Sequence, residues 1–140
     1  MIKVDEDSAK LALMELAESF GANEKEVLEL LPVAMEGRLF LRADKAVYTL
    51  GKPVKMLAGD DLSEIVLREP QASDYVSYSK NMTVTVSRDG ATEVDAVMMT
   101  RRTMRAVATL AEQPVGIVDK LSVRDIRTLG EVCEALGFFE

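Results

Sequence analysis

Residues 46–67 read AVYTLGKPVKMLAGDDLSEIVL and carry the pattern that decides the fold. The segment begins with AVYTL, which is rich in strand formers, and two further strand-like stretches at 54–57 and 64–67 flank the turn signal AGDD at 58–61. We therefore predict a β-hairpin near 46–67, preceded by a third strand near 39–50. The REP sequence at 68–70 ends the hairpin, because proline has no N–H to donate to a β-ladder.

Residues 1–36 have the pattern of two helices joined by a short hinge. Gly21 suits the left-handed position after the first helix, Asn23 can cap the second, and Pro32 discourages its continuation. The segment holds nine acidic and three basic residues, which is most of the chain's net charge of -7. We predict a helical hairpin subregion over 1–36 and an α+β core over 37–140, within one compact domain. The hairpin is either a packing appendage or a partner-binding arm.

The last third of the chain is predicted to be helical. One helix is expected over 92–113 and a final one from the cap at Ser122 to Gly137. Residues 82–91 are either a short strand with a turn at 89–90 or a loop. The buried face expected for the first helix consists of Val97, Met104, Val107, Ala108 and Ala111. The predicted fold is thus α+β, with an N-terminal helical hairpin, a small antiparallel sheet and C-terminal helices.

The composition narrows the classes of function. Of the 140 residues, 48% are apolar and 29% charged, as in a soluble globular protein. There is no histidine, the usual general base, and the single cysteine, Cys133, lies on the apolar stripe of the final helix. We find no catalytic, metal-binding or cofactor-binding pattern and expect no enzyme. The acidic start and the lack of a long apolar run lead us to expect a cytoplasmic protein without membrane contact.

Two side-chain clusters on the predicted long helix offer binding chemistry. Arg101, Arg102 and Arg105 form a basic edge that either binds phosphates or carboxylates or is simply solvated. Met98, Met99 and Met104 either fill an irregular core or form a surface that adapts to a partner, because methionine is flexible and polarizable. The net negative charge disfavours nucleic acid as the target of the arginines.

Three stretches resemble the phage tail assembly chaperone family of Mu-like and P2-like contractile-tailed phages. YTLGKPV at 48–54 and LSEIVLREPQASD at 62–74 are similar to its L-x-x-P strand and its strand ending L-R-E-P-x-x-x-D. Residues 117–138 are similar to the family's ending L-x-x-x-D with later apolar positions and a final aromatic. The resemblance covers 48–140, weakly at 78–110, and leaves 1–45 outside. Its motif residues, which we expect to be structural, are Leu67, Arg68, Glu69, Pro70, Asp74 and Asp125.

The resemblance implies a protein without catalysis or cofactors that binds the phage tape measure protein and keeps it soluble during tail assembly. It implies the cytoplasm of a bacterial host, and it leaves open self-association and a longer frameshifted product that contacts the major tail tube protein. Two rival classes remain. One is a small nucleic-acid-binding or regulatory module that uses the Arg101–Arg105 helix edge, and the other is an enzyme that uses carboxylates such as Glu64, Glu69 or Asp74.

A tape measure protein is expected to present amphipathic helices, which an apolar groove accommodates. The methionines of the long helix and the aromatic residues after Gly137 can line such a groove, and arginines at its edge can attract acidic client residues. The residues that we expect to bind the client are Met98, Met99, Arg101, Met104, Arg105, Phe138 and Phe139. If these residues are ordinary core instead, no such groove exists.

Overall fold

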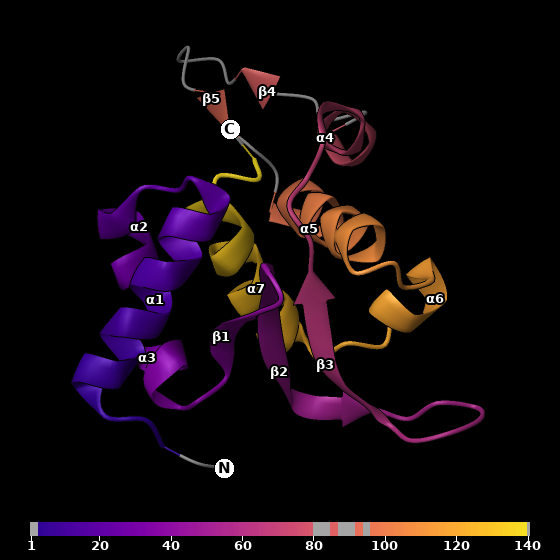
Figure 1. The fold of residues 1–140 in the computed structure, drawn as a ribbon. Coiled ribbons are helices and arrows are strands. Elements are labelled where there is room, and N and C mark those ends of the chain that lie inside the picture. Colours follow the sequence, from indigo (N-terminus) through magenta and orange to yellow (C-terminus); the bar gives the residue numbers. More distant parts are fainter. Residues whose placement is uncertain (1–2, 80–84, 87–91, 94–95, 140) are drawn as a thin grey trace.

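The computed structural model describes residues 3–79, 85–86, 92–93 and 96–139 of the chain. It confirms an α+β fold in which helices surround a three-stranded antiparallel sheet (Figure 1). The sheet has the order β1-β2-β3 and consists of β1 (Leu39–Arg42), β2 (Lys45–Val54) and β3 (Leu62–Leu67). The helices are α1 (Glu6–Phe20), α2 (Glu24–Leu28), α3 (Leu31–Met35), α4 (Ala72–Ser79), α5 (Ala96–Leu110), α6 (Val115–Val118) and α7 (Val123–Ala135).

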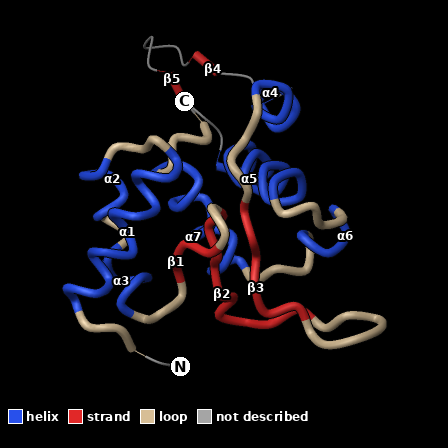
Figure 2. Tube along the Cα trace, viewed as in Figure 1, coloured by secondary structure: helices blue, strands red, loops and turns tan. Residues whose placement is uncertain are grey.

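The helices form two groups on either side of the strands, with α7 between them (Figure 2). In Figure 1, α7 lies behind the sheet, α1 to α3 lie beside β1, and α5 and α6 lie beside β3. The inner face of the sheet, which includes Tyr48 and Ile65, belongs to the hydrophobic core. Because the helices meet this one face, the other face of the sheet is left outside the helical layer.

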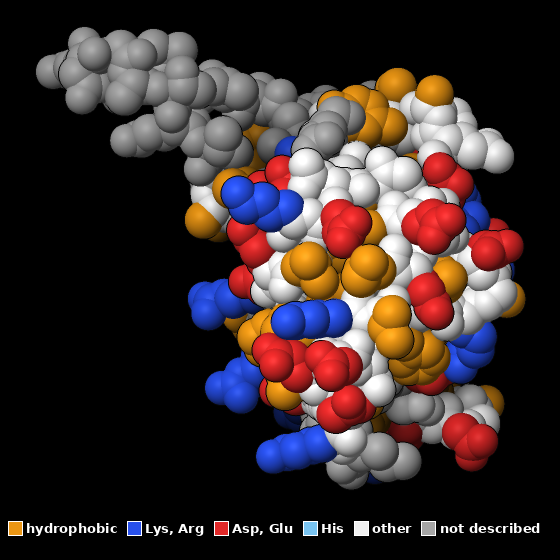
Figure 3. Space-filling model, turned by 60° about the vertical axis from the view of Figure 1, so that its left-hand side comes forward, with side chains coloured by type: hydrophobic (Ala, Val, Ile, Leu, Met, Phe, Trp, Pro, Cys, Tyr) orange, Lys and Arg blue, Asp and Glu red, His pale blue; other side chains and the backbone are white. Residues whose placement is uncertain are grey.

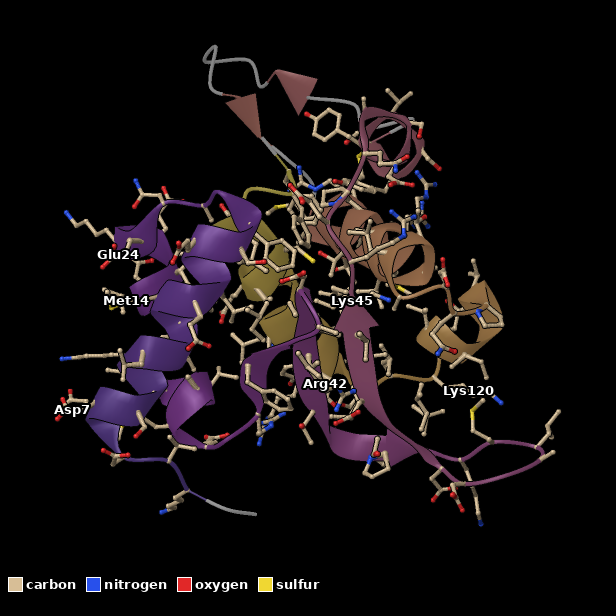
Figure 4. All side chains as sticks on the ribbon, viewed as in Figure 1. Asp7, Met14, Glu24, Arg42, Lys45 and Lys120 are labelled. Atoms are coloured by element: carbon tan, nitrogen blue, oxygen red, sulfur yellow. The ribbon has the colours of Figure 1, made fainter. Side chains whose placement is uncertain are left out.

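An ion pair crosses the other face of the sheet, which we call the outer face. Phe40, Val47 and Val66 are neighbours across the three strands, and Val47 is fully buried although it does not belong to the main core. Arg42 on β1 pairs with Glu64 on β3 at 2.9 Å, and β2 runs between these two strands. The ion pair therefore spans β2 across the outer face. Figure 4 shows Arg42 and Lys45 at this sheet.

The predicted hairpin near 46–67 is confirmed as the antiparallel pairing of β2 with β3. Its first strand, however, runs from 45 to 54 rather than over 54–57, and the pairing register shifts between Thr49 and Val54. The third strand predicted near 39–50 is wrong in extent: β1 ends at Arg42, and a turn at Ala43 and Asp44, both of which have positive φ angles, joins it to β2. The sequence did not predict this tight turn, because it contains no glycine.

The N-terminal helices are confirmed, with one more helix than predicted. Gly21 has the left-handed conformation at φ 61°, and the Asn23 side chain accepts a hydrogen bond from the Glu26 N–H, as their positions predicted. The second predicted helix is divided into α2 and α3. Pro32 does not end it but lies in the first turn of α3, where the missing N–H of proline has no consequence.

The C-terminal helices are confirmed with different boundaries. Thr92 does not begin the long helix, since it pairs with Val86 in a two-stranded sheet of β4 (Thr85–Val86) and β5 (Thr92–Glu93). The turn predicted at 89–90 lies outside the described residues. Pro114 precedes α6, and the Ser122 side chain caps α7 by accepting from the Asp125 N–H, as predicted. Cys133 is buried, as its position on the apolar stripe indicated, and burial raises the pKa of its thiol to about 12.

The hydrophobic core combines the N-terminal helices with the C-terminal ones. Leu13 and Leu16 of α1 are fully buried, and the Phe20 ring lies 5.6 Å from the Phe138 ring. The division into 1–36 and 37–140 stays a prediction, which truncation to 37–140 would test. These shared contacts lead us to expect that the truncated protein loses stability.

The outer side of the N-terminal helices is exposed and acidic, with hydrophobic side chains between the carboxylates (Figure 3). Met14 and the acidic side chains Asp7 and Glu24 point away from the sheet (Figure 4). Among the described residues, no helix combines the length and the apolar character needed to cross a membrane.

Candidate functional site

A groove of about 240 Å³ lies between α5 and α7. Its walls combine apolar side chains with charged ones. Its lining includes Met99, Arg102 and Thr103 from α5, Ile126, Arg127, Gly130, Glu131 and Glu134 from α7, and Phe139 after the end of α7. Such a groove can take an apolar side chain of a partner while offering two guanidinium groups beside it.

Gly130 allows the two helices to approach closely beside this groove. A Cβ atom at position 130 would lie 3.1 Å from the Thr103 hydroxyl oxygen, and Thr103 is buried. Glycine in a helix interior is less favourable than alanine by about 1 kcal/mol, so the close packing of α5 on α7 offsets a weaker local preference. The buried face of α5 consists of Thr103, Ala106, Val107 and Leu110.

This face differs from the predicted one. Val97, expected in the core, is 56% exposed, whereas Met104, Ala108 and Ala111 only pack against the edge of the core. The physical reason is that the polar residue Thr103 occupies a central buried position opposite Gly130. The true buried face is therefore rotated relative to the purely apolar stripe that the sequence indicated.

Arg102 lies in the groove with its guanidinium stacked on an aromatic ring. The guanidinium carbon is 3.8 Å from the centre of the Phe139 ring, and the Phe139 ring in turn contacts Tyr78 at 5.9 Å. The Arg102 Nε is buried and has no hydrogen-bond acceptor. Among the described residues, no carboxylate lies within ion-pair distance of Arg102 or Arg127.

The motif at 67–74 forms a compact junction. Arg68 makes two hydrogen bonds with the Asp74 carboxylate, at 2.7 and 3.1 Å, and the Arg68 N–H donates to the carbonyl of Leu110. The hydrogen bonds from Arg68, together with one from the Gln71 N–H, lower the pKa of Asp74 to about 2. The junction ties the end of β3 to the start of α4 and to the end of α5. Leu67 is fully buried.

Asp125 is the most extensively hydrogen-bonded side chain among the described residues. It is 1% exposed and lies in the first turn of α7. One carboxylate oxygen accepts from the Tyr48 hydroxyl at 2.7 Å, the Gly51 N–H at 2.8 Å and the Arg38 guanidinium at 3.1 Å. The other accepts from the Lys52 N–H at 3.1 Å and the Ser122 hydroxyl at 2.9 Å. The carboxylate therefore ties α7 to the irregular part of β2.

Two opposing effects act on the ionisation of Asp125. Burial raises the pKa of its carboxyl group, but the hydrogen bonds, led by those from Gly51 and Tyr48, lower the pKa below its ordinary value. Gly51 leaves room for the network, because a Cβ atom there would lie 3.0 Å from the Arg38 guanidinium and 3.3 Å from the Asp125 carboxylate. The charged form of Asp125 is thus the form that this site accommodates.

A family model described as "Phage tail assembly chaperone proteins, E, or 41 or 14" matches residues 47–137, about two-thirds of the chain. The chain belongs to this family. The match contains the Arg68–Asp74 pair, Asp125 and both helices of the groove, whereas α1, α2, α3 and Arg38 precede it. Comparisons with curated proteins and with solved structures found no match. The resemblance inferred from the sequence is confirmed.

The residues predicted to bind the client of this tail assembly chaperone do not lie together. Met99 and Phe139 line the α5–α7 groove. Arg101 and Met104 line a separate hollow on α5. Phe138 is 2% exposed and packs in the core. Two others lie on α5 but line neither hollow: Met98, which is half-buried, and Arg105, which is exposed.

The prediction missed the groove residues contributed by α7 and placed Arg102 on a helix edge without distinguishing it from its neighbours. Arg102 lies three residues after Met99, so the helical repeat puts the two on one side of α5. That spacing was a usable signal. Ile126, Arg127 and Gly130 carried no such signal, because only the packing of α5 against α7 brings them to the same surface.

Proposed function

We propose that this tail assembly chaperone binds the tape measure protein in the α5–α7 groove and keeps it soluble during tail assembly. Family membership supports the general role. The observation that carries the site is that Met99, which is 40% exposed, and Phe139 flank one groove together with two arginines. The other residues predicted to bind the client do not line this groove.

The chemistry of the groove suits a helical client. An amphipathic helix binds by placing a few apolar side chains in such a groove, and flexible methionine adapts to their shape. Arginines beside the groove add orientation and speed of association more than affinity. The net charge of -7 favours the solubility of a complex that contains an aggregation-prone partner.

Co-expression with the cognate tape measure protein tests the proposal. Met99→Glu places a carboxylate at the mouth of the groove, and we expect the tape measure protein to move into the insoluble fraction. The matched control is Val123→Glu, at a position on α7 that is 68% exposed and does not line the groove. The proposal is wrong if the Met99→Glu protein, with an unchanged melting temperature, keeps its client as soluble as the control does.

The proposal also covers the location and the further partners that the family resemblance implies. It includes a non-enzymatic role in the cytoplasm of a bacterial host, contact with the major tail tube protein through a frameshifted longer product, and self-association. The architectural role that we propose for Leu67, Arg68, Glu69, Pro70, Asp74 and Asp125 belongs to it as well.

The rival nucleic-acid-binding module would use the exposed residues Arg101 and Arg105. Retention of the protein on heparin at ordinary salt, lost on changing these two arginines, would favour that alternative. A thermal shift on adding divalent metal ions would favour the carboxylate enzyme.

A further inference from the structure

Arg102 differs from the other half-buried arginines of the described chain. Arg38 pairs with Asp125 and Glu36, and Arg68 pairs with Asp74. Arg102 instead has an aromatic ring against its guanidinium, no acceptor for its buried Nε and no carboxylate among the described residues within 4.0 Å. A cation–π contact holds the side chain in place but supplies no negative charge to pair with the guanidinium.

We propose that Arg102 is the recognition point for a carboxylate of the client. An Asp or Glu on an amphipathic client helix pairs with the Arg102 guanidinium, while adjacent apolar side chains of the same helix pack against Met99, Ile126 and Phe139. This inference rests on the proposed function and deepens it, because it names the chemistry that selects one client segment over another. Stacking on Phe139 orients the guanidinium, so less conformational freedom is lost when the ion pair forms.

The charges around the groove support a client helix as the occupant and indicate the orientation in which it binds. Arg102 and Arg127 make one part of the surface basic. Glu131 and Glu134 line the groove and also an adjoining hollow of about 560 Å³. That hollow is completed by two further acidic side chains, Glu26 and Glu29. A client helix with its acidic residue at Arg102 and basic residues further along would match this change of sign, and the reversed helix would meet like charges.

The test uses the full-length chaperone and fluorescently labelled helical peptides that cover the tape measure protein, with binding followed by anisotropy. Arg102→Met removes the charge and keeps much of the packing volume. We expect it to bind the recognised peptide about tenfold to hundredfold more weakly than the wild type and with less dependence on salt. Arg124→Met is the matched control. It removes the same charge at an exposed position on α7 that does not line the groove, and we expect a change of less than about twofold.

A second arm leaves the chaperone unchanged. Each acidic residue of the recognised peptide is replaced in turn by Gln or Asn, and we expect one replacement to weaken binding as much as Arg102→Met does. That replacement should have no further effect on the Arg102→Met protein, because the two changes remove the same contact.

The outcomes separate this inference from the proposed function. If no peptide binds the wild type, both are overturned. If the wild type binds a peptide and Arg102→Met binds it equally well, or no acidic replacement matters, the role of Arg102 is wrong while the proposed function stands.

Discussion

Asp125 is buried and Arg102 is half-buried, and the surroundings of their two charges differ. The Asp125 carboxylate accepts five hydrogen bonds, which come from β2, from the turn before α7 and from Arg38. The Arg102 guanidinium is stacked on Phe139 and has no carboxylate partner among the described residues. The charge of Asp125 is satisfied within the fold, whereas no described carboxylate pairs with the charge of Arg102.

This difference supports the two roles that we propose, a structural role for Asp125 and a binding role for Arg102. Burying a charge is unfavourable unless hydrogen bonds or an opposite charge compensate it. Asp125 is compensated internally and therefore has nothing to offer a partner. Arg102, at the groove, has no carboxylate partner among the described residues, and we propose that a client supplies one. We therefore expect the free energy of unfolding to depend mainly on Asp125 and client binding to depend mainly on Arg102.

The largest effect is expected for Asp125→Ala. The change leaves the Arg38 guanidinium, the Tyr48 hydroxyl and two backbone N–H groups without their acceptor, so we expect the free energy of unfolding to fall by about 3–5 kcal/mol. Arg102→Met loses only the contact with Phe139, and we expect a loss below about 1 kcal/mol. Urea unfolding of both variants measures the difference. Equal losses would contradict the division.

A smaller effect is expected for Gly51→Ala. This change tests whether the Asp125 network needs the backbone at Gly51 to lie close to the side chains of Arg38 and Asp125. The added Cβ atom would lie 3.0 Å from the Arg38 guanidinium, so the network must shift, and we expect a loss of about 1–3 kcal/mol. Gly116→Ala in α6 is the control, because no atom lies within 4 Å of its new Cβ. Helix preference should make the control neutral or about 0.5–1 kcal/mol more stable. Urea midpoints that fall equally would show that the crowding at Gly51 is irrelevant.

The smallest effect on the free energy of unfolding is expected for the half-buried ion pair of Arg68 and Asp74. The pKa of Asp74 is about 2 in the folded protein and near 4 in an unfolded chain. The ionised carboxylate therefore stabilises the fold above about pH 4, and this contribution is lost as the pH falls toward 2. Asp74→Asn should lower the free energy of unfolding by about 1–2 kcal/mol at pH 7. A difference from the wild type that stays constant from pH 7 to pH 2 would exclude this linkage.

Local signals made much of the fold predictable from the sequence. Gly21, Asn23 and Ser122 end or begin helices through their own backbone or side-chain geometry, so a few neighbouring residues are enough to recognise them. The hairpin near 46–67 was predictable for the same reason. The turn at Ala43 and Asp44 was not, because residues other than glycine rarely adopt positive φ angles.

Contacts between distant segments limited what could be predicted about the site. Asp125 was recognised as a motif residue, but its partners in β2 precede it by more than 70 residues, and Arg38 lies outside the resemblance. The spacing of Arg102 and Met99 puts them on one side of α5, but the sequence did not show that this side faces α7, because the rotation of α5 depends on the contact between Thr103 and Gly130. The surroundings of Asp125 and of Arg102 both depend on which face of a helix packs against another element.

Methionine-methyl NMR of the full-length protein, with the tape measure protein added, tests the central claim most directly. Met99 at the groove and Met14 on the outer side of α1 are almost equally exposed, at 40% and 42%, so each reports on one candidate surface. Our account predicts that the Met99 methyl signal shifts or broadens while the Met14 signal stays unchanged. A change at Met14 with an unchanged Met99 would contradict it, and would assign client binding to the N-terminal helices instead.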